Sequence, residues 1–438
     1  MRQAFSAAAA LAATFSLTAS AQTIPKCGPG SPCPKDTPCC SQYGQCGVGA
    51  YCLGGCDPEY SFTLNSCMAA PVCKSADYKL TSLDGIESNT QYLGDASDTN
   101  WVVSGLAVPY QDKALLLTMA PDTVGTLLMS THYVWYGKVS ATMTTSQGQG
   151  VVSAFILMSD VKDEIDFEFV GVDLTHAQTN FYFQGITDYN NGDETETSNT
   201  VQEMHTYTID WQPDYVSWAI DGEVGRTVYK NDTWNSTSNK YHFPQTPSRV
   251  QLSLWPAGLP TNGQGTIDWA GGEIDWDSPY MQNGYYFAQV QDISVECYDP
   301  PADVQRDGDS AYYYLSTEGM EDDVAIGDKN TVLGSLYATG DKPDFDPSDD
   351  DDEDSSGQTQ APETVPGISG GGSQQLEGEG AGEAAGGSGS GSAASSAAGS
   401  SPTGSTYGFT QGGTSQASTV YAGSAVALLG FFVAALML

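Results

Sequence analysis

The sequence predicts an all-β protein built around one antiparallel β-sandwich, and three observations support this. Short runs of aliphatic, β-branched and aromatic residues recur from about residue 74 to residue 300, as strands do. The clearest are residues 114–119, 136–144, 151–157, 207–211, 216–220 and 250–254. Gly, Pro, Asp and Asn separate the runs, Asp221-Gly222 suits a tight hairpin turn, and no stretch keeps a helical period. A sandwich of roughly 225 residues fits a single domain.

The charge of the chain excludes some partners. Only 15 Lys and Arg oppose 54 Asp and Glu in 438 residues, for a formal net charge of -39. Such an acidic protein is not expected to bind nucleic acid or an anionic membrane surface directly. No cofactor and no metal are expected, because the chain has only four His without ligand-like spacing. A monomer is expected.

Residues 1–21 are predicted to be a secretory signal peptide. Arg2 is followed by an apolar run over residues 7–17 and by Ala19-Ser20-Ala21, a small-residue cleavage site before Gln22. The alternative is a buried N-terminal helix. Secretion also agrees with the cysteine content, since nine of the ten cysteines lie between Cys27 and Cys73.

Residues 22–67 are predicted to form a small module held by disulfides, because so short a segment cannot bury a sufficient core. The segment Cys39-Cys40-Ser41-Gln42-Tyr43-Gly44-Gln45-Cys46 resembles the hevein-type chitin-binding module. The resemblance implies that Ser41 hydrogen-bonds N-acetylglucosamine and that Tyr43 and Tyr51 offer ring faces to it. Gln45 stands where the family usually has an aromatic residue, so weaker chitin binding is expected.

The same resemblance implies three disulfides in the module, Cys27–Cys40, Cys33–Cys46 and Cys39–Cys52. Four cysteines then remain, and the residues alone leave three pairings open. Cys56–Cys67 with Cys73–Cys297 is preferred, because it ties together the two ends of the next domain; Cys67–Cys73 is the main alternative. Zinc binding by these thiols is disfavoured by the secretory route.

Residues 68–300 are predicted to be catalytic, because of the stretch from Val161 to Gly171. As a strand, it places Glu164, Asp166 and Glu168 on one face and Ile165, Phe167 and Phe169 on the other. Three neighbouring carboxylates repel, so at least one should hold a proton at neutral pH. Such a group is a candidate acid/base site.

The triple-carboxylate strand resembles the Glu-x-Asp-x-Glu motif of glycoside hydrolase family 16, which implies a β-jelly roll and a retaining mechanism. The resemblance implies Glu164 as the nucleophile, Glu168 as the general acid/base and Asp166 as a helper. Glu164 is then expected to be ionised and Glu168 to have a raised pKa. Retention needs two carboxyls about 5–5.5 Å apart, and long Glu side chains can lean toward each other from Cα atoms roughly 13 Å apart.

Further segments, residues 205–211, 247–258 and 265–272, are similar to the fungal Crh cell-wall transglycosylases. The resemblance implies that the protein cleaves chitin as donor and transfers the new reducing end to β-glucan as acceptor. Trp255, Trp269 and Tyr182 are the candidate substrate-binding aromatics. The alternatives are a plain chitin or β-glucan hydrolase of the same fold, and a wall-binding lectin without catalysis.

The C-terminal part is predicted to anchor the enzyme. A transitional segment, residues 301–340, precedes an acidic and then Ser/Gly-rich stalk over residues 341–419 that cannot form a core. Residues 420–438 are apolar and uncharged, as in a glycosylphosphatidylinositol (GPI) anchor signal; a retained membrane helix is the alternative. The predicted location is the plasma membrane and the cell wall. Asn231 and Asn235 are N-glycosylation candidates.

Overall fold

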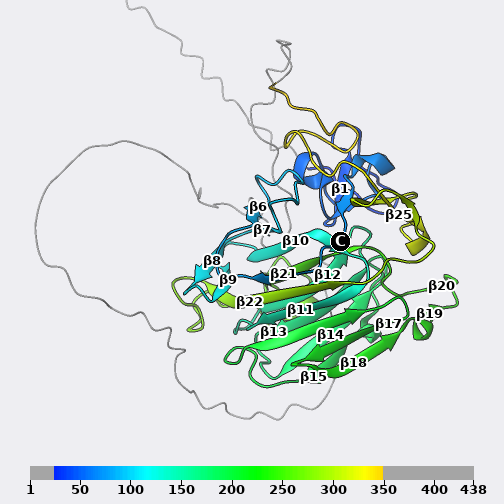
Figure 1. Cartoon of the computed structure of the whole chain (residues 1–438). Coiled ribbons are helices and arrows are strands. Elements are labelled where there is room, and N and C mark those ends of the chain that lie inside the picture. The colour runs from blue at the N-terminus through cyan, green and yellow to red at the C-terminus, as the bar shows by residue number, and fades with distance from the viewer. Residues whose placement is uncertain (1–23, 349–438) are drawn as a thin grey trace, which may run out of the picture.

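The structure is a computed structural model, and it describes residues 24–348 of the chain (Figure 1). The expected signal peptide, nearly all of the stalk and the expected anchor signal lie outside the described residues. Among the described residues, no helix has the length and apolar character needed to cross a membrane.

Two large sheets packed face to face form the main body, which confirms the predicted antiparallel sandwich (Figure 1). The first sheet has the order β15-β14-β13-β12-β21-β10-β7-β6, and only its β6–β7 pair is parallel. Its strands are β6 (Ile86–Ser88), β7 (Trp101–Ser104), β10 (Thr126–Val134), β12 (Val151–Ser159), β13 (Glu164–Val170), β14 (His176–Tyr182), β15 (Asp193–Glu196) and β21 (Ser248–Pro256).

The second sheet has the order β18-β17-β16-β11-β22-β9-β8, with β5 added to β22. Its strands are β5 (Ala76–Lys79), β8 (Ala107–Tyr110), β9 (Ala114–Met119), β11 (Gly137–Met143), β16 (His205–Trp211), β17 (Tyr215–Ile220), β18 (Glu223–Tyr229) and β22 (Tyr286–Cys297). A small hairpin of β19 (Trp234–Asn235) and β20 (Lys240–Tyr241) follows β18.

The main core lies between the two sheets and follows from the alternation of apolar residues in the strands. Phe155 of β12 stacks on Phe167 of β13 with ring centroids 6.2 Å apart, and Phe169 meets Tyr207 of β16 at 4.6 Å. All four side chains are fully buried. Because alternate residues of a strand point to opposite faces, this packing turns the even-numbered residues of β13 away from the core.

The six predicted strands are all present, as β9, β11, β12, β16, β17 and β21. Asp221 and Gly222 both have positive φ, 52° and 88°, as a primed hairpin turn requires. The one α-helix of residues 24–348, α1 (Gln264–Trp269), lies in a stretch where no helix was expected. With six residues it is too short to produce a periodic pattern in the sequence.

The N-terminal module is a three-stranded sheet of order β2-β1-β3 with two short 3₁₀ helices. Three disulfides staple it at Cys27–Cys40, Cys33–Cys46 and Cys39–Cys52, and a fourth joins Cys56 to Cys67. The fifth, Cys73–Cys297, spans 224 residues. The first three are the pairs that the resemblance implies, and the last two are the preferred pairing of the remaining cysteines rather than the Cys67–Cys73 alternative. The elements are β1 (Cys39–Ser41), β2 (Cys46–Gly47), η1 (Gly49–Cys52), β3 (Cys56–Asp57) and η2 (Leu64–Ser66).

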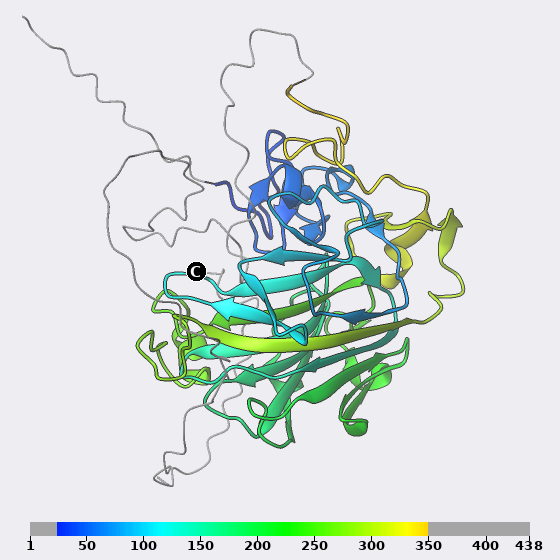
Figure 2. The same ribbon diagram turned by 60° about the vertical axis from the view of Figure 1, so that its left-hand side comes forward.

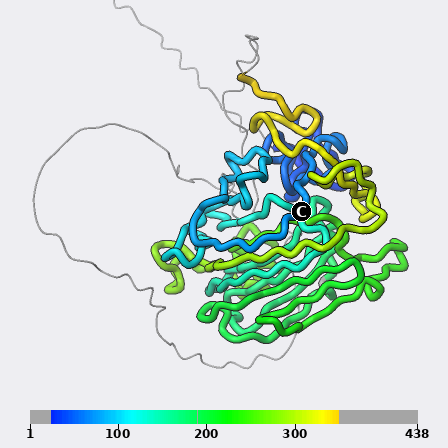
Figure 3. Tube along the Cα trace, viewed as in Figure 1, coloured from blue at the N-terminus to red at the C-terminus, as the bar shows by residue number. Residues whose placement is uncertain are grey.

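The segment after residue 300 packs on the rest of the protein and returns to the module (Figures 2 and 3). A four-stranded sheet of order β23-β25-β24-β4 pairs it with the residues that leave the module. Its strands are β4 (Ala70–Pro71), β23 (Gln305–Asp307), β24 (Ala311–Tyr314) and β25 (Val324–Gly327). The chain after β25 then runs along the module, and residues 328–345 are called the strap below.

Candidate active site

Strand β13 presents the three predicted carboxylates side by side. Glu164, Asp166 and Glu168 point away from the inter-sheet core, as the alternation predicts, and only 1%, 1% and 6% of their surface is exposed. Their neighbours on β12, on the same face, are apolar: Met158, Ile156 and Ala154. This side of the first sheet, which carries the three carboxylates, is called the carboxylate face below.

The start of β13 is fixed by a buried aspartate. The carboxylate of Asp163 accepts hydrogen bonds from the backbone N–H groups of Gln184 (3.0 Å), Gln245 (2.9 Å) and Thr246 (3.1 Å), and from the Thr246 hydroxyl (2.7 Å). Asp163 has no exposed surface. It therefore serves the fold, holding two loops at the strand end from which Glu164 projects.

Strand β14 lines one flank of the carboxylates with polar side chains. Tyr182 stands directly opposite Glu164 in the register, Asn180 opposite Asp166 and Gln178 opposite Glu168. Asn180 donates its amide N–H to the hydroxyl of Tyr182 at 2.7 Å. The structure thus brings Tyr182, a predicted substrate-binding residue, next to the predicted nucleophile.

Strand β21 adds two polar side chains that were not predicted as site residues. Gln251 lies in register with Asp166 through Ile156, and Ser253 lies in register with Glu168 through Ala154. Both are buried, and both amide atoms of Gln251 and the Ser253 hydroxyl lack a hydrogen-bond partner. Such atoms are costly to bury unless a ligand uses them. The signal was present in the sequence, because polar Arg249, Gln251 and Ser253 alternate with aliphatic residues.

The two predicted tryptophans lie together beyond Glu168. Trp255 is the penultimate residue of β21 and Trp269 ends α1, with ring centroids 6.2 Å apart. Trp269 donates its indole N–H to the side-chain oxygen of Gln178 at 2.8 Å. Because Gln178 is opposite Glu168, the indole pair borders the carboxylate face.

The environment raises the pKa of all three carboxyl groups. Burial lifts the pKa of Glu164 and of Glu168 well above the usual carboxyl value, and the charge of Asp166 raises both further. Burial also raises the pKa of Asp166, to about 7, against the opposing effect of Arg226. The raised pKa of Glu168 agrees with the expectation. The raised pKa of Glu164 differs from it, because Glu164 shares the same apolar surroundings.

The residues predicted to bind chitin in the module are not open to solvent. Ser41, Tyr43 and Tyr51 keep only 3%, 8% and 4% of their surface exposed. Tyr43 and Tyr51 belong to a buried cluster that includes residues of the sandwich. The glycosylation candidates are more accessible: Asn231 is exposed, and Asn235 is half-buried at the β19–β20 hairpin.

Comparison with known proteins gives consistent matches. Residues 95–271 match the family described as Glycosyl hydrolases family 16. "Crh-like protein 3" of Botryotinia fuckeliana is 56% identical over 315 residues, which cover 72% of this chain and 71% of that protein. "Crh-like protein 2" of Aspergillus fumigatus is 54% identical over 336 residues, 76% of this chain and 75% of that protein. The solved "Crh5 transglycosylase in complex with NAG" is 30% identical, covers 61% of this chain and 98% of its own, and aligns with a TM-score of 0.50.

Proposed function

The chain belongs to the fungal Crh-type transglycosylases of glycosyl hydrolases family 16, and from this premise we propose that it cross-links the cell wall by cleaving chitin and passing the new reducing end to β-glucan. The observation that carries the chemistry is the buried row of Glu164, Asp166 and Glu168 on one strand. Two carboxyls with different protonation states are what retaining glycoside cleavage requires.

In the first half of the reaction, the Glu164 carboxylate attacks the anomeric carbon of the donor sugar. The bond from that carbon to the leaving oxygen breaks, and Glu168 gives its proton to that oxygen. A covalent glycosyl ester on Glu164 results. Asp166, between the two, holds a charge or a proton according to the state of its neighbours.

In the second half, a hydroxyl of the acceptor glucan replaces the departed fragment. Glu168, now ionised, takes the proton of the acceptor hydroxyl. The oxygen of that hydroxyl attacks the anomeric carbon, and the ester bond to Glu164 breaks. Water can follow the same route, so transfer requires that a sugar occupy the acceptor position more productively than water. Trp255, Trp269, Tyr182 and the amide of Gln251 supply stacking surface and hydrogen bonds for sugars on this face.

The roles of the two glutamates are tested by separate substitutions. In Glu168→Gln the second half-reaction slows by roughly 10²–10⁴-fold, so the glycosyl ester on Glu164 accumulates with a donor whose leaving group needs no acid. Mass spectrometry of the peptide that contains Glu164 detects the added sugar. Glu164→Gln forms no such adduct. An adduct on another residue would contradict the assignment.

Transfer is tested with chitin oligomers and a fluorescent β-glucan oligomer as acceptor. Labelled hybrid products support the proposal, whereas free chitin fragments without labelled hybrids indicate a plain hydrolase. Wall cross-linking that persists unchanged in Glu164→Gln would instead indicate a lectin without catalysis. The Glu164→Gln variant therefore serves as the control for both alternatives.

The proposal includes the location of the enzyme. The pattern of residues 1–21 supports secretion, and five disulfides agree with an oxidising compartment. The apolar, uncharged residues 420–438 support attachment through a GPI anchor at the plasma membrane and the wall. A monomer is proposed. Release of the enzyme from cells by a phospholipase that cuts such anchors is the test of the attachment.

A further inference from the structure

The carboxylate face changes character across the first sheet. The register joins Asp166 to Ile156, Gln251, Met129 and Val102 in turn, so these side chains point to the same side. Met129 is three strands from Asp166, which is about 14 Å at the usual strand spacing. Polar groups suited to sugar hydroxyls thus give way to an apolar surface on β10 and β7.

The N-terminal module covers this apolar surface. One continuous buried cluster contains Val102, Leu127 and Met129 of the sandwich together with Tyr43 and Tyr51 of the module. Leu127 is in register with Ser253, so it also lies on the carboxylate face. The aromatic side of the module that resembles a chitin-binding surface is therefore packed onto the same face that carries the catalytic groups.

Tyr43 packs on the β10 side of the carboxylate face, because it belongs to the same buried cluster as Met129, which is in register with Gln251. Burial raises the pKa of Tyr43, the nearby Arg249 charge lowers it, and the Glu164 charge raises it. Arg249 is two strands from Glu164 in the register, about 10 Å away. Its guanidinium also donates to the backbone oxygen of Gly54 in the module, at 3.1 Å.

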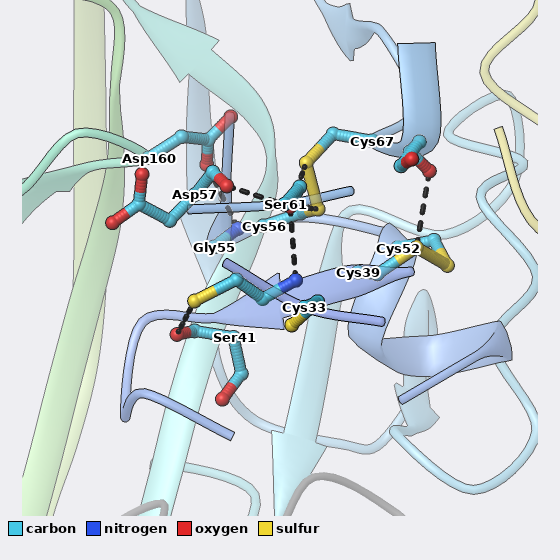
Figure 4. The surroundings of a disulfide bond; sticks show 12 residues. Cys33, Cys39, Ser41, Cys52, Gly55, Cys56, Asp57, Ser61, Cys67 and Asp160 are labelled. Atoms are coloured by element: carbon cyan, nitrogen blue, oxygen red, sulfur yellow. Dashed lines mark hydrogen bonds between the residues drawn. A yellow bond between two sulfur atoms is a disulfide. The ribbon is translucent and has the colours of Figure 1, made fainter. Parts of the chain in front are cut away.

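Buried polar contacts hold the module in place. The N–H of Gly55 donates to the Asp160 carboxylate at 2.8 Å (Figure 4). It also donates to the hydroxyl of Tyr133 at 3.1 Å, and that hydroxyl donates to Asp160 at 2.7 Å. Lys162 pairs with Asp57 of the module at 2.7 Å, with little of either side chain exposed. Largely buried polar groups that are hydrogen-bonded in this way make the contact between the module and the sandwich rigid.

The strap also packs on the module. The N–H of Gly49 donates to the oxygen of Ala338 at 2.8 Å, and the N–H of Gly340 donates to the oxygen of Ser66 at 2.9 Å. A Cβ on Gly49 would lie 2.1 Å from the oxygen of Leu336, so the strap passes too close for any other residue there. The module thus contacts both the sandwich and the strap.

We propose that the N-terminal module is a fixed wall of the saccharide-binding surface, with Tyr43 bounding the last sugar site on the β10 side of Glu164. The module then contacts chitin only where the polymer lies along the carboxylate face, and it limits how many sugars the enzyme binds on that side. The statement about sugars rests on the proposed function; the docking of the module does not.

Docking is tested in the full-length protein without substrate. Tyrosine nitration, followed by mass spectrometry, compares Tyr43 and Tyr51 with Tyr229 and Tyr280, which expose 54% and 44% of their surface. Tyr43 and Tyr51 should react on the order of tenfold more slowly or less, because the module must open first. Nitration of Tyr43 and Tyr51 as fast as that of Tyr229 would overturn the proposal.

The effect on substrate length is tested with Tyr43→Ala and, as a matched control, Tyr229→Ala. For chitin oligomers of increasing length, kcat/KM of the wild type should stop rising once the sites up to the wall are filled. Tyr43→Ala should shift that plateau and the product lengths, and Tyr229→Ala should not. If Tyr43→Ala only weakens adsorption to chitin beads and leaves product lengths unchanged, the module acts as a lectin. The proposal that it bounds the sugar-binding surface is then refuted. If the wild type cleaves no chitin, the proposed donor is wrong. The nitration result would still test whether the module is docked on the sandwich.

Discussion

At the scale of single residues, the main feature of the candidate active site is that three carboxyl groups are buried next to one another. Glu164 and Glu168 have raised pKa values chiefly because they are buried, and the charge between them, on Asp166, raises them further. Arg226 is the cation that favours the ionised form of Asp166. The middle residue therefore sets how tightly the two outer residues hold their protons, which makes it the natural place to tune the pH range of the enzyme.

Asp166→Asn should move the alkaline limb of the pH profile of kcat/KM to lower pH. In the proposed mechanism that limb reports loss of the proton from Glu168, and an ionised Asp166 raises the pKa of Glu168. Removing the charge lowers that pKa, so activity is lost earlier as pH rises. The acid limb should move less, because Asp166, with a pKa of about 7, is mostly protonated there. An alkaline limb that stays in place or moves upward would contradict this account.

At the scale of elements, the site depends on how the neighbouring strands pair with β13 as much as on β13 itself. Strands β14 and β21 supply Tyr182, Gln178, Gln251 and Ser253, and the register alone decides which carboxylate each one faces. A shift of one residue in either strand would turn these groups into the core. Trp218 of β17, in the second sheet, helps to fix the position of β13 by donating its indole N–H to the backbone oxygen of Asp166 at 2.9 Å.

Gln251→Leu should separate activity from stability. Both amide atoms of Gln251 are buried without a partner, so an apolar replacement should raise the free energy of unfolding by about 1 kcal/mol. The same change removes groups offered to sugar hydroxyls and should lower kcat/KM by about tenfold. Urea unfolding and transfer kinetics measure the two effects. Gln289→Leu, on the second sheet, is the control and should leave kcat/KM unchanged. Loss of stability in Gln251→Leu would show that the amide serves the fold.

The sequence predicted those features that are determined by residues close together in the chain. The alternation of β13 gave the faces of Glu164 and Phe167 correctly, and the turn residues gave the hairpin at Asp221. It could not give the position of the module, because that depends on which strands lie side by side. Val102 and Met129 are 27 residues apart in the chain, and both are far from Tyr43. The same holds for α1, since six residues carry no helical period.

At the scale of the whole molecule, the segments that enter and leave the sandwich are tied together. Strand β4, just after the module, pairs with β24, and β5 pairs with the long β22. Between these pairings lies the Cys73–Cys297 disulfide. The catalytic sandwich, the module and the strap are therefore joined by backbone pairing as well as by side-chain contacts, and they should unfold with strong mutual dependence.

Removing the Cys73–Cys297 bond should destabilise the protein more than removing Cys56–Cys67. The first closes 224 residues and the second 11. In the chain-entropy account, these loops correspond to about 5 and about 3 kcal/mol of unfolding free energy. Paired Cys→Ser variants compared by thermal and urea unfolding measure the difference. An equal or smaller loss for the long-range pair would mean that the sheets alone hold the ends together.

The Cys73–Cys297 bond also imposes an order of events on biosynthesis. At about 5–20 residues per second, a ribosome needs about 10 to 45 s to make the intervening chain. Throughout that time Cys73 lacks its native partner, and Cys67 is only six residues away. If Cys56 pairs with Cys67 early, Cys73 remains available for Cys297. If Cys67 and Cys73 join first, the Cys73–Cys297 bond cannot form until that bond is exchanged. The yield of active enzyme is thus tied to disulfide isomerase activity in the cell that makes it.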